Sequence, residues 1–215
     1  MTLSSQPHTP TPLPRLALTG GIACGKSLLS HYLNELGVET IDADDIVHEL
    51  IPDPAERRRM AAEVFADQEK RKALEARLHP LVKARIEAFI SGIPGASGNS
   101  GYSGHSGYSG VSGASGASGI RIAIIPLLFE THWDAEYDII CCVASERETQ
   151  ISRMMATRGY TREEAEARLA AQLPVAEKAA KSHYVIDNNG TAEELRSKAE
   201  EFVKWLKNSM CLPTR

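Results

Sequence analysis

A short segment near the N-terminus combines glycines, a lysine and a hydroxyl in the spacing of a phosphate-binding loop. Residues 20–27 read Gly-Gly-Ile-Ala-Cys-Gly-Lys-Ser and match G-x-x-x-x-G-K-[ST]. Glycines let backbone N–H groups turn toward a polyphosphate, Lys26 supplies a cation, and the Ser27 hydroxyl can bind Mg²⁺. An apolar run at 16–19 precedes the loop and a helical pattern at 27–36 follows it. The order strand, loop, helix therefore predicts a site for a nucleoside triphosphate.

Acidic residues follow a second apolar run, at 39–41. Because parallel strands end at the same sheet edge, we expect Asp42 and Asp44 to emerge beside the phosphate loop. A carboxylate there can accept a proton from a substrate hydroxyl or hold a water of Mg²⁺. The alternative is an acidic cluster that only caps the next helix, which suits Asp45 best.

The apolar run at 120–125 leads into the segment 126–130, Pro-Leu-Leu-Phe-Glu. Most phosphate-loop motors and switches place a metal-binding aspartate at the end of such a strand, and Pro126 stands here instead. The sequence also has no Asn-Lys-x-Asp segment of the kind that guanine-specific switches use. Both absences argue against a GTPase or an ATPase motor.

Arginines recur through a helical pair at 145–173 that Gly159 interrupts. They are Arg147, Arg153, Arg158 and Arg168. Such a pair suits a lid that closes on ATP and neutralises charge on the transferring phosphoryl group, and Arg158 is the residue we expect to do so. The alternative is a surface helix with ion pairs one turn apart, which fits Arg162 and Glu166.

Short apolar runs alternate with helical patterns, which predicts a three-layer α/β fold with a five-stranded parallel sheet covered on both faces. The predicted strands are 16–19, 39–41, 120–125, 139–143 and 184–186. Capping boxes predict three helix starts, at Ser145/Glu148, Thr161/Glu164 and Thr191/Glu194. The last helix has an apolar stripe of Leu195, Ala199, Phe202, Val203 and Leu206.

The organisation we predict is a tail at 1–14 and a kinase-like domain at 15–210, with its core at 15–50 and 120–210. Residues 51–90 form a helical substrate subdomain with an apolar side of Phe65, Leu74, Leu78, Leu81, Val82 and Ile86. Gly-x-Ser repeats at 95–119 are too polar to offset ordering entropy, so residues 91–119 are predicted to be a flexible insertion.

Composition excludes several classes of protein. The 215 residues have a net charge of −4 and no dominant basic block, so nucleic acid is not an expected partner. No run reaches the roughly 18 apolar residues of a membrane span, and the N-terminal segment lacks a signal core. The four cysteines, Cys24, Cys141, Cys142 and Cys211, lack metal-ligand spacing, and the adjacent pair reads as core filling. We expect a reduced, cytoplasmic protein.

Together these segments resemble the dephospho-CoA kinase family. The matching segments are 18–22 with 25–27, 41–44, 78–81 (Leu-His-Pro-Leu), 126–130, Arg153 with Arg158, and 184–190. The resemblance implies ATP-dependent phosphorylation of the ribose 3′-hydroxyl of dephospho-CoA, with Mg²⁺, by a monomer or small homo-oligomer. The sequence departs from the family pattern at Ala23, Cys24 and Leu28, in a short helical subdomain, and in the insertion.

The resemblance also implies residue roles. Asp44 matches the base, Thr19 a residue near the reacting groups, Lys26 the phosphate-loop lysine, Arg158 the lid arginine and Ser27 the metal-binding hydroxyl. The nucleotide would contact Gly21, Ala23, Cys24, Gly25, Lys26, Ser27, Leu28, Arg153, Asn188 and Asn189. The acceptor would contact Asp42, His79, Pro126, Leu127, Phe129 and Glu130. For His79 the alternative is a histidine that ends a helix before Pro80.

Two other readings stay open at this point. One is another small-molecule kinase, of the nucleotide or shikimate kind, which would share the core and differ in its acceptor pocket. The other is a nucleotide-binding module with little catalysis, which the departures at Ala23 and Leu28 allow.

Overall fold

A computed structural model describes residues 14–93 and 119–210. Its centre is a five-stranded sheet in the order β2-β3-β1-β4-β5, and every strand pair is parallel. This confirms the predicted fold class. The strands are β1 (Leu16–Gly20), β2 (Glu39–Asp42), β3 (Arg121–Ile124), β4 (Ile139–Ala144) and β5 (Tyr184–Asp187). Each lies at a predicted strand, with ends that differ by one residue.

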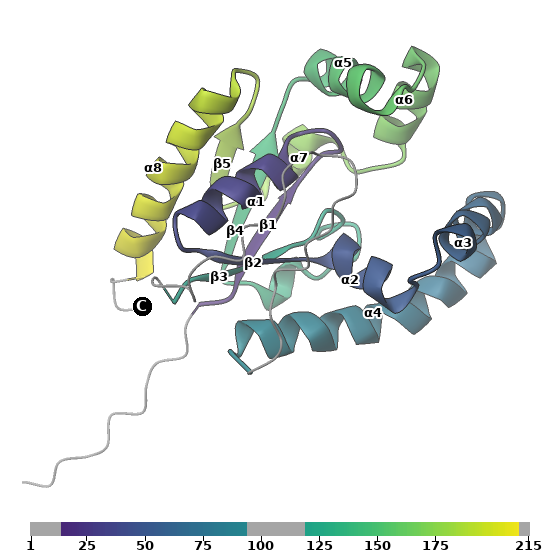
Figure 1. The fold of residues 1–215 in the computed structure, drawn as a ribbon, viewed down its shortest axis with the longest axis horizontal. Coiled ribbons are helices and arrows are strands. Elements are labelled where there is room, and N and C mark those ends of the chain that lie inside the picture. The colour runs from purple at the N-terminus through teal and green to yellow at the C-terminus, as the bar shows by residue number, and fades with distance from the viewer. Residues whose placement is uncertain (1–13, 94–118, 211–215) are drawn as a thin grey trace, which may run out of the picture.

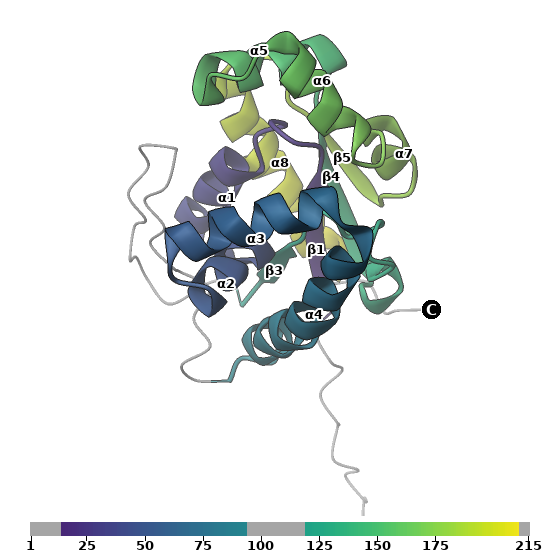
Figure 2. The same cartoon turned by 90° about the vertical axis from the view of Figure 1, so that its right-hand side faces the viewer.

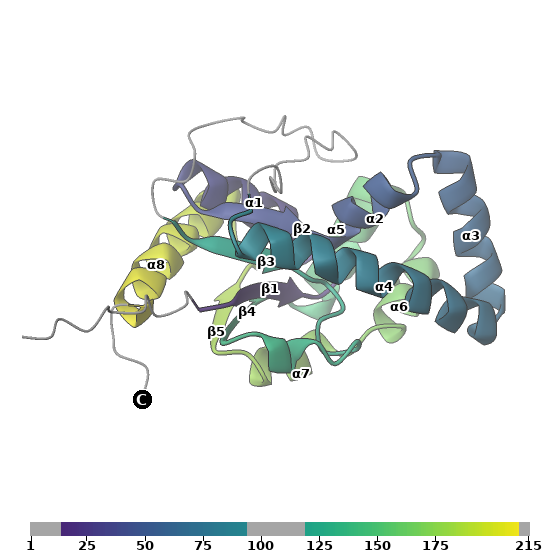
Figure 3. The same ribbon diagram turned by 90° about the horizontal axis from the view of Figure 1, so that it is seen from below.

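Helices cover both faces of the sheet (Figures 1 and 2). They are α1 (Lys26–Glu35), α2 (Ala43–Leu50), α3 (Pro54–Ala66), α4 (Gln68–Ile90), α5 (Arg147–Arg158), α6 (Arg162–Ala170), α7 (Val175–Ala180) and α8 (Ala192–Met210). A 3₁₀ turn, η1, spans Asp134–Glu136. Figure 3 shows α1 and α7 on opposite sides of the sheet and α3 projecting away from it. None of the helices in these two described ranges is long and apolar enough to cross a membrane.

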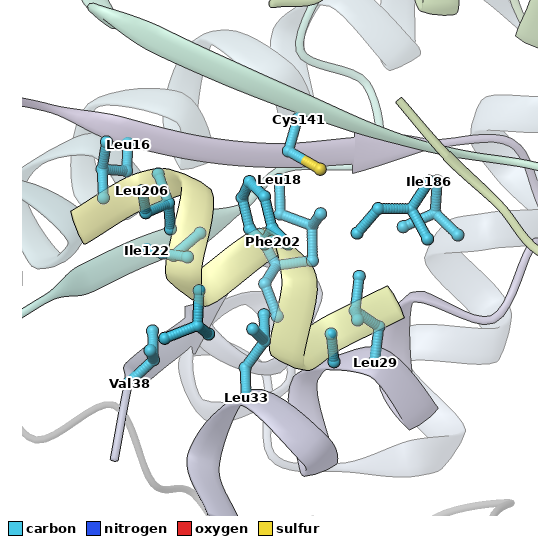
Figure 4. Packing of buried hydrophobic residues seen from close by; sticks show 14 of the residues in the cluster. Leu16, Leu18, Leu29, Leu33, Val38, Ile122, Cys141, Ile186, Phe202 and Leu206 are labelled. Atoms are coloured by element: carbon cyan, nitrogen blue, oxygen red, sulfur yellow. The ribbon is translucent and has the colours of Figure 1, made fainter. Parts of the chain in front are cut away.

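One face of the sheet packs against α1 and α8 (Figure 4). Leu18, Ile122 and Cys141 from three strands meet Leu29 of α1 and Phe202 of α8 in this cluster. All five residues of the predicted stripe on α8 are buried, at 5 % exposure or less. Cys24, Cys141 and Cys142 are buried free thiols, as core filling requires; Cys211 lies outside the described residues.

The opposite face packs against α2 and the second half of α4. Val82, Ile86 and Phe89 of α4 are buried with Ala17 and Ile41 of the sheet. The second half of α4 is thus part of the main core. The predicted apolar side was wrong for Leu81, which is 50 % exposed, because the neighbouring Val82 faces the sheet.

The helix starts test the capping-box predictions. Thr161 and Glu164 form a full box at α6, and Thr191 and Glu194 exchange the equivalent hydrogen bonds of 3.2 and 3.3 Å at α8. The box predicted at Ser145 was wrong, since α5 begins at Arg147. The buried Ser145 hydroxyl instead donates to the Asn188 carbonyl at 2.7 Å and so joins β4 to the end of β5.

Candidate active site

The carboxyl ends of the parallel strands place the chemically active segments at one edge of the sheet. Gly20, at the end of β1, pairs with Val143 of β4, and Asp42, at the end of β2, pairs with Ile124 of β3. The phosphate loop, the acidic segment and Pro126 therefore leave the sheet side by side. This is the edge at which open α/β sheets bind ligands.

The loop backbone takes a shape that needs glycine at both ends. Gly25 precedes α1 with φ of 92°, and a Cβ there would overlap Nδ2 of Asn188. A Cβ on Gly20 would overlap the carbonyl oxygen of Val143. Asn188, which is 5 % exposed, also donates to the Cys24 carbonyl at 2.8 Å. The loop is thus held from below by the end of β5 and is anchored for an anion at the start of α1.

Lys26 turns back over the loop. Its Nζ donates to the carbonyls of Gly20 and Gly21 at 3.1 and 2.9 Å. Burial lowers the pKa of Lys26, while the carboxylates of Asp42 and Asp44 act to raise it. The ammonium is therefore placed between the loop and the acidic residues, where a phosphate would supply a better partner than two carbonyls.

The acidic residues are arranged by the start of α2. The strand ends at Asp42, whose Oδ1 accepts from the Asp44 N–H at 2.8 Å, so Asp42 caps the helix. The alternative that gave Asp45 as the cap was wrong for that residue, because the chain turns into the helix three residues earlier, at Asp42. Burial, followed by the charge of Asp44, raises the pKa of Asp42 to about 7. Two carboxyl groups thus share this edge of the sheet.

A cavity of about 490 Å³ opens over the loop. Eleven predicted site residues line it: Ala23, Gly25, Lys26, Ser27, Leu28, Asp42, Asp44, Pro126, Arg153, Arg158 and Asn188. The lining also includes Ile22, Thr157, Gln172, Gly190, Thr191 and Ala192, which the sequence analysis did not select. The cavity brings a lysine, two arginines and two carboxylates around one space.

Other predicted nucleotide-side residues lie behind this wall. Thr19 and Cys24 are fully buried, and the Thr19 hydroxyl donates to the Pro126 carbonyl at 3.3 Å. Gly21 lines a second cavity of about 510 Å³. Asn189 accepts from the Glu146 N–H at 2.7 Å and so fixes the start of α5. These residues shape the loop and its supports rather than face the cavity.

Most of the predicted acceptor-side residues are outside the cavity lining. Phe129 is 5 % exposed and packs in the core below Lys181. Leu127 is partly buried. His79 lies edge-on to Trp133, with ring centroids 5.1 Å apart. The alternative for His79 was wrong, because α4 continues through Pro80 to Ile90 and the histidine is inside the helix.

Glu130, also predicted on the acceptor side, is bound to the protein itself. Its Oε1 accepts from Nζ of Lys178 at 2.7 Å and from the Leu173 N–H at 3.0 Å.

The arginines of α5 and α6 divide into two groups. Arg153 and Arg158 line the cavity, and Arg153 also donates to the Ala23 carbonyl at 3.4 Å and to the Ser145 hydroxyl at 3.1 Å. The others serve the helical pair: Arg168 lies 4.3 Å over the ring of Tyr160, Arg147 is 3.9 Å from Glu166, and Arg162 pairs with Glu148 at 2.6 Å and with Glu166 at 3.2 Å. The predicted Arg162–Glu166 ion pair is confirmed.

Two glutamines that the sequence analysis missed hold the phosphate loop. Nε2 of Gln150, in α5, donates to the Ile22 carbonyl at 2.7 Å. Oε1 of Gln172, after α6, accepts from the Ile22 N–H at 3.2 Å. The next residue, Ala23, has φ of 58°, a left-handed conformation that is costly for alanine. A glutamine inside a helical pattern gives no sequence signal of such a contact.

Fold and cavity together define a class of protein. A parallel sheet in this order, with a phosphate loop after β1, acidic groups after β2 and an arginine-bearing helical pair after β4, is that of a phosphate-loop kinase. Solved structures agree on the fold. A Thermus thermophilus protein matches with a TM-score of 0.69 at 27 % identity, over 91 % of this chain and 99 % of its own. Shikimate kinase from Acinetobacter baumannii matches with a TM-score of 0.58 at 16 % identity, over 93 % and 96 %.

Sequence comparison identifies the particular family. Residues 15–56 and 115–194 match the family described as dephospho-CoA kinase. The dephospho-CoA kinase of Geobacter sulfurreducens is 36 % identical, over 89 % of this chain and 97 % of the relative. That of Symbiobacterium thermophilum is 34 % identical, over 86 % and 78 %. The chain belongs to the dephospho-CoA kinase family.

Proposed function

We propose that this protein transfers the γ-phosphoryl group of ATP to the ribose 3′-hydroxyl of dephospho-CoA, the last step of coenzyme A synthesis. The observation on which this rests is the single cavity that joins the phosphate loop to Asp42 and Asp44, in a chain of the dephospho-CoA kinase family. Positioning and charge stabilisation account for most of the catalysis in such a reaction.

The nucleotide lies along the loop in this proposal. Backbone N–H groups of residues 21–27 and the ammonium of Lys26 hold the β- and γ-phosphates, because that ammonium already lies against the loop carbonyls. The guanidinium of Arg153 and the side chain of Asn188 border the nucleoside end of the cavity, with Asn189 behind them. Gly21, Cys24, Gly25 and Leu28 shape this surface.

The acceptor hydroxyl is activated by Asp44. Its side chain lines the cavity and is exposed, so it can reach a ribose hydroxyl and take its proton. Arg158, at the end of α5, approaches the same space and stabilises the charge of the transferring phosphoryl group when α5 and α6 act as a lid. Thr19 holds the wall through Pro126.

The residues present fit a magnesium ion. In the described part of the chain, no three His, Cys, Asp or Glu side chains group as a complete metal site. The Mg²⁺ ion of a kinase site needs fewer protein ligands, because substrate phosphates and water fill most of its coordination positions. The Ser27 hydroxyl and the carboxylates of Asp42 and Asp44 line one cavity, where burial, followed by the charge of Asp44, raises the pKa of Asp42. Bound there, Mg²⁺ would neutralise charge on the β- and γ-phosphates.

The acceptor enters between α4 and the segment 126–130. Pro126 and Asp42 border the cavity. Phe129 is in the core cluster that also contains Trp133, and His79 lies edge-on to Trp133. We propose that His79 hydrogen-bonds a ribose or phosphate oxygen, that Leu127 and Phe129 shape the base pocket, and that Glu130 holds the segment in place. The residue range 51–90 would then serve as the substrate subdomain.

The setting we propose is the cytoplasm, with the chain as a monomer or small homo-oligomer. Its buried cysteines are free thiols, as a reducing compartment requires.

The experiment that tests the activity compares acceptors with the full-length protein. ADP formation with ATP and Mg²⁺ is measured in the presence of dephospho-CoA, AMP, shikimate and gluconate. Dephospho-CoA alone should raise ADP formation well above background and gain one phosphate by mass. The variant Lys26→Ala should fold and lose turnover, because its side chain contributes charge to the site rather than core packing.

The same assay separates the remaining readings. Faster turnover of AMP or shikimate would replace the proposal with another small-molecule kinase. Binding of ATP without turnover of any acceptor would indicate a nucleotide-binding module, and thermal shift measures that binding directly. His79→Ala should raise the KM for dephospho-CoA more than the KM for ATP.

A further inference from the structure

A fully buried lysine lies behind the phosphate cavity and has no part in the chemistry described so far. Lys178 is in α7, and its side chain is 0 % exposed. Its Nζ donates to the Pro126 carbonyl at 2.8 Å and lies 2.7 Å from Oε1 of Glu130. Burial of a charge is costly unless it is paired and hydrogen-bonded, so this pair is maintained against a penalty.

Both acceptors of Lys178 are connected to the candidate site. Pro126 lies on the cavity wall, and its carbonyl also accepts the hydroxyl hydrogen of Thr19, which immediately precedes the phosphate loop. Oε1 of Glu130 also accepts from the N–H of Leu173. Leu173 lies between α6 and α7, where the arginine-bearing helical pair returns to the sheet. The pair therefore joins three segments that converge on the cavity.

The positive charge of Lys178 also affects the pKa of Lys26 in the phosphate loop. Burial is the main cause that lowers the pKa of Lys26, and the positive charge of Lys178 lowers it further. The same charge acts to lower the pKa of Cys142, on β4. The buried ammonium thus lies near the phosphate loop, while its own hydrogen bonds are directed to Pro126 and Glu130.

We propose that Lys178 and Glu130 are positioning residues for the phosphoryl transfer: they fix Pro126 and Leu173 relative to the phosphate loop. Glu130 then acts through Lys178 and the backbone, because its Oε1 accepts from Nζ of Lys178 and from the N–H of Leu173. The inference rests on the proposed function, since the role belongs to that reaction. The competing explanation is a buried ion pair that serves folding alone.

Two variants separate contact from charge. Glu130→Gln removes the negative charge but keeps an oxygen that can accept from both Lys178 and Leu173. Lys178→Met/Glu130→Gln removes the ammonium as well, and Pro126 loses its donor. The double variant leaves no unpaired buried charge, so its fold should persist, because neutral replacements of buried ion pairs are often tolerated.

Activity and stability should respond differently. For Glu130→Gln we expect a kcat between that of the wild type and that of the double variant, because one side-chain oxygen can still accept from Lys178 and Leu173. For the double variant we expect a kcat at least about 10-fold lower and a KM for ATP within about 3-fold, since small displacements of reacting groups reduce rate strongly. A double variant with wild-type kcat would overturn the positioning role, whatever its melting temperature.

The matched control is another hydrogen-bonded ion pair. Arg121 and Glu39 lie 2.9 Å apart across β2 and β3, at the amino ends of the strands and away from the cavity. Arg121→Met/Glu39→Gln should leave kcat unchanged, and an equal loss of kcat there would also overturn the proposal. If Lys178→Met/Glu130→Gln does not fold, the kcat of Glu130→Met is compared with that of Glu130→Gln instead, and equal values would overturn the proposal.

A failure of the proposed function is distinguishable from a failure of this inference. The wild type is assayed first with each acceptor, and the variants are then measured with the acceptor that it phosphorylates. A different preferred acceptor refutes the proposed substrate, whereas equal kcat values of wild type and double variant refute the positioning role.

Discussion

Single carboxylates are the residues on which the chemistry of this site most directly depends. Asp42 and Asp44 are two positions apart, yet the turn from strand into helix gives them different surroundings. Asp42 caps α2 and has a raised pKa, whereas Asp44 is exposed to the cavity. The more exposed carboxylate is the one that a substrate hydroxyl can reach, which favours Asp44 as the base.

We predict that Asp44→Asn lowers kcat by about 10²–10⁴-fold, the usual cost of losing a general base, and changes the KM for ATP by much less. The amide keeps the size of the side chain but cannot take the hydroxyl proton. Steady-state kinetics with ATP and dephospho-CoA measure both quantities. Asp45→Asn, one residue further in the same helix, is the control and should retain activity. If Asp42→Asn proves more damaging than Asp44→Asn, the roles of the two are reversed.

The raised pKa of Asp42 also predicts a pH dependence of stability. The folded state keeps this proton up to about pH 7, whereas the ordinary pKa is 3.8. The unfolded state therefore releases it first, and the folded protein loses stability as pH rises from 4 through 7. Asp42→Asn removes this loss while it keeps an oxygen for the helix cap.

The melting temperature of Asp42→Asn, without nucleotide or metal, should therefore exceed that of the wild type by more at pH 8 than at pH 5. A gain of about 2–4 °C at pH 8 corresponds to ~1 kcal/mol in a protein of this size. Asp53→Asn is the control, since Asp53 makes the same capping bond, 2.8 Å to the Ala55 N–H, at an exposed helix start. A difference that is equal at both pH values contradicts the assignment.

Helix α5 comes late in the chain, yet its side chains hydrogen-bond to the phosphate loop. Gln150, in the first half of α5, donates to the carbonyl of Ile22, and Gln172, beyond α6, accepts from the N–H of Ile22. Arg153 adds a contact to the Ala23 carbonyl, next to the left-handed backbone of Ala23. These hydrogen bonds join the helical pair to the loop, so we expect a displacement of the helices to change the conformation of the loop.

We predict that Gln150→Met destabilises the protein by about 1 kcal/mol, the cost of leaving the part-buried Ile22 carbonyl without its donor. It should also reduce the thermal shift that ATP produces, because the loop backbone is no longer held. Differential scanning fluorimetry with and without ATP measures both effects. Arg147→Met, in the first turn of the same helix, should change neither, because its side chain is exposed and its ion pair is long. A wild-type ATP shift in Gln150→Met would refute the clamp.

For the protein as a whole, the Gly/Ser-rich segment at 91–119 is the predicted insertion. Most of it lies outside the described residues, as does the tail at 1–13, so its predicted flexibility stays a prediction. The described chain on either side ends α4 at Ile90 and begins β3 at Arg121. Neither end contributes a residue to the lining of the phosphate cavity.

Replacement of residues 95–119 by a short Gly/Ser linker should leave kcat within about twofold and the melting temperature within a few degrees. Loop-closure free energy changes by only about 0.6 kcal/mol for each doubling of length, so little is gained or lost. Activity and thermal melting of the shortened protein test this. Loss of turnover in a protein that still melts cooperatively would place the insertion at the active site.

The sequence by itself determined the fold class, the phosphate loop and the family. Local patterns are enough for these, because apolar period, loop spacing and capping boxes depend on residues within a turn or two of each other. Each of the five strands and the apolar stripe of α8 was predicted in place. The errors at Ser145, Asp45 and Leu81 were errors of one to three residues, at points where a strand or helix meets its neighbours.

Only the tertiary structure decided which side chains face the cavity. Asp42 and Asp44 follow β2, Pro126 follows β3 and Asn188 follows β5, and their meeting depends on the order and register of the sheet. Three side chains bind residues that are distant in the chain: the partners of Gln150, Gln172 and Lys178 lie 128, 150 and 52 positions away. Such contacts leave no local pattern, because a hydrogen bond needs the two partners close in space and not in the chain.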